Sequence, residues 1–264
     1  MLRSLYTAAT GMEAQQLKMD TISNNLANAS TTGYKRARPD FEDLLSETIH
    51  GSGSPNSLGG NAPAPLEVGL GVRPSSTSHS QAQGDPQLTQ NPTDFLINGQ
   101  GYFRVQRPNG EYAYTRSGNF TIDANSRLVT QHGEIVEPQI TIPSDADHSS
   151  LLLDPQTGIM TVKVTGKTDP VQVGTLEISV FPNTNGLTSI GNNLLIETEA
   201  SGPPMQEKVG EGAAGVIEQG QLETANVKAV EEMIDMITTQ RAYEMNSKVI
   251  QTADQMLQKL TSLR

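Results

Sequence analysis

The chain has 264 residues and a mass of 28.3 kDa, which allows one or two domains of ordinary size. Its 18 Lys and Arg against 29 Asp and Glu give a formal net charge of -11, so we expect binding neither to nucleic acid nor to anionic membranes. Cys is absent, which excludes disulfides, thiolate metal sites and Cys nucleophiles, and no apolar run reaches the about 18 residues of a membrane span.

The N-terminal segment, residues 1 to about 28, is predicted to form one long helix. It contains no Pro and one Gly, and its apolar side chains recur at intervals of three and four residues, as in a heptad seam. Its start has neither the apolar core nor the cleavage site of a secretory signal, so we expect no general secretory route and no membrane insertion. The seam residues expected at an interface are Leu5, Met12, Met19, Ile22 and Leu26.

Residues 36–80 are predicted to be an extended arm or connector. Within them, residues 51–65 are dominated by Gly, Ser, Pro and Asn, which occupy 12 of the 15 positions and leave too few apolar side chains for a core. Two interpretations stay open: a flexible linker, or an arm that becomes ordered only against a neighbouring subunit.

Residues 81–216 are predicted to form a central β-rich domain of short antiparallel strands. Gly and Pro recur every few residues, and pairs such as Phe103 and Val105 place apolar side chains on one strand face. The same alternation occurs at Val162 and Val164 and at Leu176, Ile178 and Val180. The dipeptides typical of tight hairpins are Asn98-Gly99, Asn109-Gly110, His132-Gly133 and Asn185-Gly186.

The C-terminal segment, about residues 221 to 262, contains neither Gly nor Pro and is predicted to be a second, longer helix. Its apolar stripe begins at Leu222 and Ala225 and recurs with a seven-residue period. Polar side chains occupy core-type positions on both predicted helices: Gln15 on the first, and Glu232, Thr239 and Asn246 on the second. At such positions polar groups fix the register and the partner of a helix at a cost in stability. The seam residues expected at an interface are Met236, Tyr243, Ile250, Leu257 and Leu260.

A long helix at each end of a β-rich chain suggests that the ends pair. We favour the interpretation that both stripes find partners in other copies of the chain and fold fully only on polymerisation, in a coiled-coil-like layer. The alternative is an intramolecular helical hairpin packed on the β domain. Amide exchange on dilute monomer distinguishes the two, because only the hairpin protects the N-terminal helix there.

The sequence offers no recognisable catalytic, cofactor-binding or metal-binding constellation. Asp123-Ala124-Asn125-Ser126 has the first ligand types of a calcium loop, but Leu128 stands where the sharp turn needs Gly, so a hairpin turn is preferred. Asp145-Ala146-Asp147-His148 is interpreted as an acidic surface loop rather than a cation site. The histidines, interpreted as solvated loop residues, are His50, His79, His132 and His148. We therefore expect no enzyme, no cofactor and no metal.

A run of Asn and small side chains ends the first predicted helix at Asn24, Asn25, Leu26, Ala27 and Asn28, and Thr31 to Lys35 follow it. This run resembles the Asn-Asn-Leu-Ala-Asn signature near the N-terminus of the flagellar rod, hook and hook-associated axial proteins. Asp94 to Phe103 and Tyr114 to Phe120 are similar to the opening of the family's β domain. The run from Gln219 to Leu257 is similar to its C-terminal helix, with the motif Gln240, Arg241, Ala242, Tyr243 and Glu244.

The resemblance implies a non-enzymatic structural subunit of the flagellar distal rod. Such a subunit belongs to the basal body and assembles into a rigid helical tube that crosses the periplasm and transmits torque between the proximal rod and the hook. The implied partners are further copies of the chain, the other rod proteins, the hook protein, the outer-ring bushing and the flagellar type III export apparatus. In the family, a stretch at the position of residues 51–65 is associated with a straight, stiff tube.

The expected fold class is therefore α+β, with residues 1–35 and 217–264 as the terminal helical domain, 36–80 as the arm and 81–216 as the β-rich domain. Two alternative functions stay open. Within the family, the chain would be a proximal-rod or hook protein. Outside it, the same composition fits a β-rich fibre or adhesin module with helical ends, which would form a closed trimer rather than an open polymer.

Overall fold

The computed structural model describes residues 2–51, 64–143, 145–146, 150–164, 169–210, 212 and 214–262. Most of the Gly, Ser and Pro-rich stretch (52–63) and the Asp147-His148 end of the acidic loop lie outside the described residues. The chain divides into two compact units. We call them the helix unit (Met1–Ala27, Ala37–His79 and Lys228–Arg264) and the β unit (Asn28–Arg36 and Ser80–Val227).

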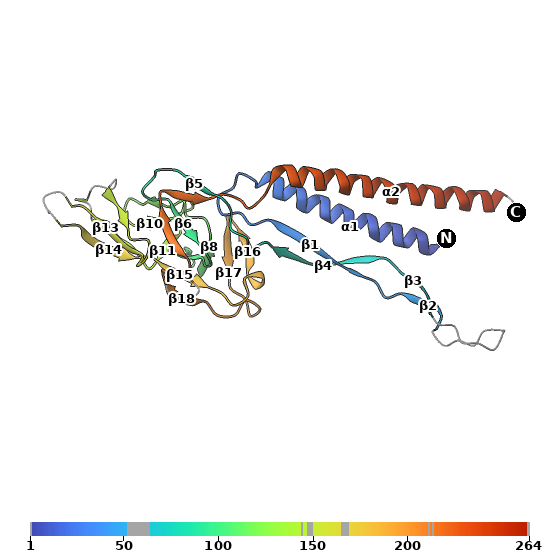
Figure 1. The fold of residues 1–264 in the computed structure, drawn as a ribbon, viewed down its shortest axis with the longest axis horizontal. Coiled ribbons are helices and arrows are strands. Elements are labelled where there is room, and N and C mark those ends of the chain that lie inside the picture. The colour runs from blue at the N-terminus through green and yellow to red at the C-terminus, as the bar shows by residue number, and fades with distance from the viewer. Residues whose placement is uncertain are drawn as a thin grey trace. The chain divides into compact units, whose positions relative to one another are not determined.

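The helix unit is built around two helices, α1 (Leu2–Ala27) and α2 (Ala229–Ser262), that lie side by side and run in opposite directions (Figure 1). The two helices thus pair within one chain. This pairing agrees with the alternative of an intramolecular helical hairpin. The favoured interpretation, that both stripes find partners in other copies, stays a prediction. The α2 helix begins eight residues later than the sequence predicted, because Leu222 and Glu223 belong to a strand and pair in the β unit.

Two antiparallel ribbons complete the helix unit. β1 (Ala37–Asp43) pairs with β4 (Val72–His79), and β2 (Glu47–His50) pairs with β3 (Leu66–Val68). Both β1 and β4 pack on α1. The contact is close at Gly71, which has a φ of +117° and where a Cβ would run into Thr10 Oγ1, so this position favours glycine.

The β unit contains a seven-stranded sheet and four smaller sheets, and every strand pair in the described part of the chain is antiparallel. In spatial order the large sheet consists of β16 (Thr188–Gly191), β17 (Leu194–Ile196), β8 (Tyr112–Thr115), β7 (Phe103–Gln106), β11 (Ile135–Glu137), β10 (Leu128–Val129) and β9 (Thr121–Ile122). The smaller sheets are β12 (Leu152–Leu153) with β13 (Ile159–Val162) and β14 (Val171–Thr175), β15 (Glu177–Val180) with β18 (Met205–Lys208), β19 (Val216–Gln219) with β6 (Phe95–Asn98), and β20 (Gln221–Glu223) with β5 (Pro86–Leu88).

One large apolar cluster forms the core of the β unit. The Phe103 ring meets the Phe120 ring edge-on at 5.1 Å between centroids, and Phe95 lies 6.2 Å from Phe120. The predicted alternation is confirmed at Phe103 and Val105, whose side chains are fully buried while their strand neighbours are not. A central antiparallel β-rich region between two helices is therefore confirmed.

The hairpin predictions are partly right. Asn109-Gly110 connects β7 to β8 and His132-Gly133 connects β10 to β11, both with a positive φ at Gly. Gly99 also has a positive φ, but β6 pairs with the distant β19, so no hairpin forms there. Asn185-Gly186 lies in a 3-10 turn, η2 (Thr184–Gly186), instead of a hairpin. The turn expected at residues 123–126 joins β9 to β10, as predicted.

Candidate functional site: the helix pair and a polar clasp

The first part of the site is the end of α1, where the Asn-rich motif lies. Asn25 is buried, and its amide bonds both main-chain groups of Ala37, with Nδ2 donating to the carbonyl oxygen and Oδ1 accepting from the amide, each at 2.9 Å. Asn25 Nδ2 also donates to Glu232 Oε2 at 3.2 Å. One planar amide, which offers donors and an acceptor, thus joins the last turn of α1 to the start of β1 and the first turn of α2.

The other motif residues have different surroundings. Asn24 and Ala27 are exposed, and Leu26 is half-buried. The Asn28 side chain accepts a hydrogen bond from Thr31 Oγ1 at 3.2 Å, and its carbonyl accepts one from the Thr31 amide at 3.0 Å. These two bonds close the turn that follows the helix.

Small and polar side chains line α2 at intervals of seven residues. Glu232 and Thr239 are 0% and 1% exposed, Ala253 is buried to the same extent, and Asn246 is half-buried. Opposite Asn246 lies Gly11 of α1, where a Cβ would come within 2.9 Å of Asn246 Nδ2. The polar core-type positions predicted at residues 232 and 239 are therefore buried, and small or polar groups form much of the contact between the helices.

The predicted seam residues lie at different depths. On α1, Ile22 is buried, whereas Leu5, Met12, Met19 and Leu26 are half-buried. On α2, Met236, Ile250 and Leu257 are half-buried, Tyr243 is 38% exposed, and the side chain of Leu260 lies outside the described residues. In the motif around Tyr243, Ala242 is half-buried, and Gln240, Arg241 and Glu244 are exposed. Their role at an interface stays a prediction.

A second apolar face of α2 was not predicted from the sequence. Val230, Met233, Ile234 and Ile237 are between 51% and 70% exposed. At 100° per residue they lie on the side of α2 opposite Glu232 and Thr239. Their spacing of i, i+3, i+4 and i+7 is a detectable signal, because it marks an apolar face distinct from the heptad stripe.

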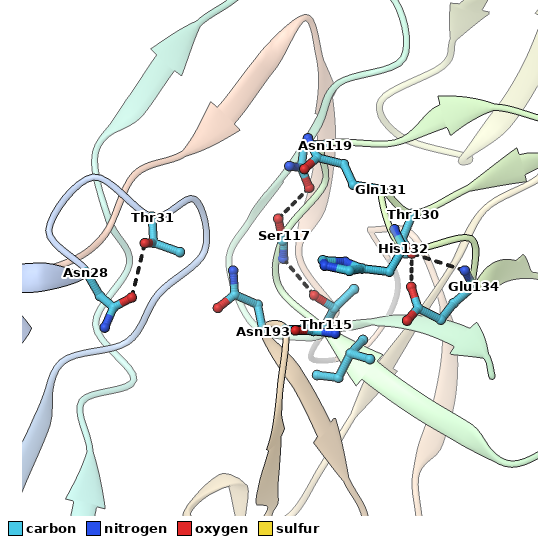
Figure 2. Close-up of a pocket in the computed structure, with 12 residues that line it drawn as sticks. Asn28, Thr31, Thr115, Ser117, Asn119, Thr130, Gln131, His132, Glu134 and Asn193 are labelled. Carbon is cyan, nitrogen blue, oxygen red and sulfur yellow. Dashed lines mark hydrogen bonds between the residues drawn. The ribbon is translucent and has the colours of Figure 1, made fainter. Parts of the chain in front are cut away.

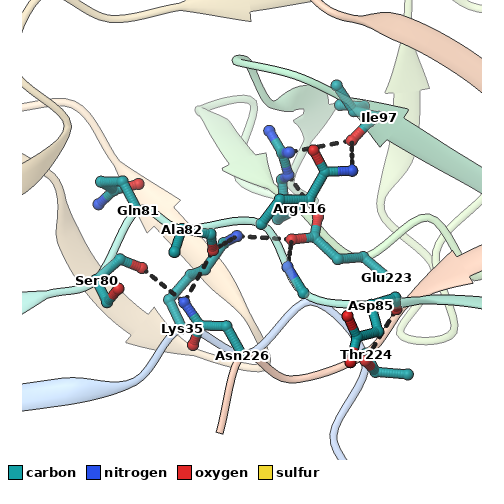
Figure 3. Close-up of polar contacts among 12 residues, drawn as sticks. Lys35, Ser80, Gln81, Ala82, Asp85, Ile97, Arg116, Glu223, Thr224 and Asn226 are labelled. Carbon is teal, nitrogen blue, oxygen red and sulfur yellow. Dashed lines mark hydrogen bonds and ion pairs between the residues drawn. The ribbon is translucent and has the colours of Figure 1, made fainter.

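The second part of the site is a buried charge cluster in the β unit (Figure 3). The Glu223 side chain is 1% exposed; Oε1 accepts from Lys35 Nζ at 2.6 Å and from the Gly84 amide at 2.9 Å, and Oε2 accepts from Arg116 Nε at 2.6 Å. The Arg116 guanidinium also donates to the carbonyl oxygens of Ile97, Gly99 and Gly101, at 3.0, 2.6 and 2.5 Å.

Asn226 adds hydrogen bonds between separate segments of the chain. Its Oδ1 accepts from the Arg36 amide at 2.6 Å, and its Nδ2 donates to the carbonyl oxygens of Ser80 at 3.0 Å and Ala82 at 2.9 Å (Figure 3). The Ser80 amide in turn donates to the Arg36 carbonyl at 2.8 Å. We call Lys35, Arg116, Glu223 and Asn226 the clasp.

Burial and charge act in opposite directions on the clasp. Burial raises the pKa of Glu223, but the positive charges of Arg116 and Lys35 outweigh it and hold that pKa below the ordinary value of 4.5. Burial lowers the pKa of Lys35 below 10.5, and the Glu223 carboxylate only partly opposes this. Glu223 is therefore ionised at neutral pH. Sequence reasoning gave the clasp no role, although all four of its residues stand in or beside the motif stretches.

The β unit also has a polar pocket of about 270 Å³ (Figure 2). Amide and hydroxyl side chains line it, and they largely bond one another: Ser117 Oγ donates to Asn119 Oδ1 at 2.6 Å, and Thr130 Oγ1 bonds Glu134. The His132 side chain is among those that line the pocket and extends toward Ser117. Within the described residues, His, Asp and Glu do not gather in a group of three that could hold a metal ion.

The helices from the two ends of the chain pair, and a β-rich region lies between them in the sequence. This is the architecture that the resemblance to flagellar axial proteins implies. The class is therefore that of an axial structural protein. Three family models match the chain: "Flagella basal body rod protein" at residues 5–35, "Flagellar hook protein FlgE/F/G D1 domain" at 96–162, and "Flagellar basal body rod FlgEFG protein C-terminal" at 218–263.

Curated relatives match along the full length. The chain is 48% identical over 263 residues to the flagellar basal-body rod protein FlgG of Buchnera aphidicola subsp. Acyrthosiphon pisum, and 46% identical over 263 residues to that of Buchnera aphidicola subsp. Schizaphis graminum. It is 46% identical over 264 residues to that of Caulobacter vibrioides. Each match covers 100% of both chains. The chain therefore belongs to the FlgG family of flagellar basal-body rod proteins.

Family membership confirms the prediction of a distal-rod structural subunit located in the flagellar basal body. The relatives are named as flagellar basal-body rod proteins, and their names state no enzymatic activity. Neither of the described helices is long and apolar enough to cross a lipid bilayer.

Proposed function

We propose that the helix pair is the polymerisation layer of this rod subunit, and that the outward apolar face of α2 packs against helices of neighbouring copies in a coiled-coil-like arrangement. The observation that carries this proposal is the exposure of Val230, Met233, Ile234 and Ile237 on one face. Their exposed area costs free energy in water, and a rod subunit necessarily contacts further subunits. The seam residues predicted from sequence belong to the same layer.

Each such contact is weak by itself. Complete burial of one side chain of this size gives roughly 1.5–3 kcal/mol, and since these side chains are already partly buried, about 1 kcal/mol each remains. Four of them contribute on the order of 4 kcal/mol, which is about what association costs in lost translational and rotational freedom. One contact leaves a dilute chain monomeric, whereas many repeated contacts along an open polymer stabilise a tube.

Association with other flagellar rod and hook proteins follows from the rod and hook families that the chain matches. Beyond this, we propose a rigid helical tube of further copies that crosses the periplasm and passes torque from the proximal rod to the hook. The outer-ring bushing would surround it, and the flagellar type III export apparatus would deliver the subunits. An open helical polymer needs different surfaces at its two ends, which an asymmetric chain presents in a heterologous, head-to-tail contact.

The proposal keeps the division of roles predicted from the sequence: 1–35 and 217–264 for polymerisation, 36–80 for the arm and 81–216 for the β-rich domain. The compact units differ from this division, since residues 28–36 and 217–227 fold with the β unit and residues 37–79 with the helix unit. Residues 51–65 would stiffen the tube by ordering against a neighbouring copy. Rods built from a chain that lacks residues 51–65 should bend more easily in electron micrographs. Straight rods of unchanged stiffness would count against the arm.

The polymerisation layer is tested by a charge on the exposed face of α2. Ile237→Asp should leave the helical circular dichroism of the monomer nearly unchanged, because this side chain is half exposed, yet rods should be absent from basal bodies isolated from cells that carry it as the sole copy. Thr238→Asp introduces the same charge at an exposed polar position about 100° further around the same helix, beside the apolar face, and should permit rods. Normal rods with Ile237→Asp would refute the proposed interface.

A further inference from the structure

Three of the four chain connections that leave the β unit meet at the clasp. The two units are joined after residues 27, 36, 79 and 227. Asn226 bonds the amide of Arg36 and the carbonyl oxygen of Ser80, which stand next to the second and third of these boundaries. Asn226 itself stands next to Val227, at the fourth. One side chain thus ties together three segments that are far apart in the sequence.

The clasp also fixes these connections to the body of the β unit. The Gly33 amide donates to the Glu223 carbonyl at 2.8 Å, and the Glu223 carboxylate binds Arg116 and Lys35. Arg116 directly follows β8 of the large sheet, and its guanidinium holds three carbonyl oxygens at the end of β6 and in the loop before β7. A pull on any of the three connections therefore reaches the large sheet through polar contacts, of which those of Glu223 and Arg116 are buried.

We propose that the clasp is a mechanical coupling. It joins the three connections into one element that opens cooperatively, and it passes force from them to the large sheet through Glu223 and Arg116. The mechanical part of the proposal rests on the proposed function as a torque-transmitting subunit. The physical reason for cooperativity is that Glu223 and Arg116 are buried, so breaking one of their contacts leaves a buried partner unpaired. Asn226 is linked to this buried pair through the Ala82 carbonyl oxygen, which accepts from both Asn226 Nδ2 and Lys35 Nζ. Without the clasp, each connection would be able to separate from the large sheet independently of the other two.

Cooperativity is tested by amide hydrogen exchange on the full-length monomer. In Asn226→Ala, the amides of Arg36, Ser80 and Thr224 should all exchange faster, by roughly tenfold and by a common factor, while amides of β7 and β8 keep their rates. Asn183→Ala is the matched control, because it removes an Asn side chain that bonds a carbonyl elsewhere in the β unit, and it should leave the three clasp amides unchanged.

A second variant distinguishes cooperative opening of the whole clasp from the loss of single hydrogen bonds. Asn226→Asp keeps an acceptor for the Arg36 amide and loses the two donors to Ser80 and Ala82. If the clasp is one element, the Arg36 amide exchanges faster even though its own acceptor remains. Acceleration confined to the Arg36 amide in Asn226→Ala, or an unchanged rate for the Arg36 amide in Asn226→Asp, would overturn the proposal.

The force path is tested in cells that carry Asn226→Ala as the sole copy. A tethered bead should report a loss of torsional stiffness of the rod relative to Asn183→Ala. Unchanged stiffness, or a failure to build rods at all, would overturn the mechanical role, since the clasp would then serve only folding or assembly. The exchange experiment uses monomer, so its outcome does not depend on whether the chain polymerises as proposed.

Discussion

Replacing Glu223 by Gln tests how much the buried ion pairs of the clasp stabilise the β unit. The change removes the negative charge that Arg116 and Lys35 share, while the Gln oxygen still accepts from the Gly84 amide. Loss of one partner of a buried pair costs about 3–5 kcal/mol, because the opposite charges stay buried. Since Gln is isosteric, we expect the lower end, about 3 kcal/mol at neutral pH. This is a large fraction of the 5–15 kcal/mol typical of a domain.

The pH dependence gives the same prediction an independent check. The folded pKa of Glu223 lies below its unfolded value of 4.5, so its stabilisation is present above pH 4.5 and is lost as the pH falls through the folded value. The difference in unfolding free energy between wild type and Glu223→Gln should therefore be constant near neutral pH and shrink as the pH falls below 4.5.

Urea unfolding followed by near-UV circular dichroism measures this difference. The chain has no Trp, and the buried rings of Tyr102 and Tyr114 make this signal a reporter of the β unit. The matched control is Glu111→Gln, which breaks an exposed pair with Arg107 and should cost no more than about 1 kcal/mol. A cost below about 1 kcal/mol for Glu223→Gln at pH 7, or one that does not change on acidification, would refute the reasoning.

Two further predictions concern single side chains. Asn25→Ala removes three hydrogen bonds and leaves the main chain of Ala37 without its side-chain partner, so the helix unit should lose about 2–3 kcal/mol. Far-UV circular dichroism at 222 nm should show earlier unfolding while the near-UV signal is unchanged; a common shift of both signals would contradict this. Burial, aided by the charge of Glu197, raises the pKa of Tyr114 to about 12, above its unfolded value of 10.0. Stability should thus be unaffected by this group below pH 10 and fall between about pH 10 and 12, and Tyr114→Phe should lack that component of the fall in alkaline urea titrations.

Elements with a strong local period were predictable from the sequence. The spacing of apolar side chains in residues 1–28 predicts a helix, and α1 spans Leu2–Ala27. The same reasoning placed the start of the C-terminal helix too early, at about residue 221. Leu222 and Ala225 fit the seven-residue period of the heptad stripe and so extend it toward the N-terminus. Leu222 is instead paired in β20, where a strand partner and a buried ion pair next to it outweigh local helix preference.

The hairpin dipeptides show the same limit. An Asn-Gly or His-Gly pair supplies the backbone conformation for a turn, and at Gly110 and Gly133 two neighbouring strands use it. At Gly99 the conformation is present, but the preceding strand pairs with β19, which lies more than a hundred residues later. Turn chemistry is local, whereas the choice of strand partner depends on the whole sheet.

The sequence by itself determined the two terminal helices, the β-rich centre, the polar positions within the heptad stripes and the family, because periods and motifs are properties of neighbouring residues. Only the tertiary structure decided that the helices pair within the chain, that Asn25 joins α1, β1 and α2, and that Lys35, Arg116 and Glu223 meet in one buried cluster. These contacts join segments up to about two hundred residues apart. Their free energy depends on burial and on opposite charges brought together, which exist only after the chain has folded.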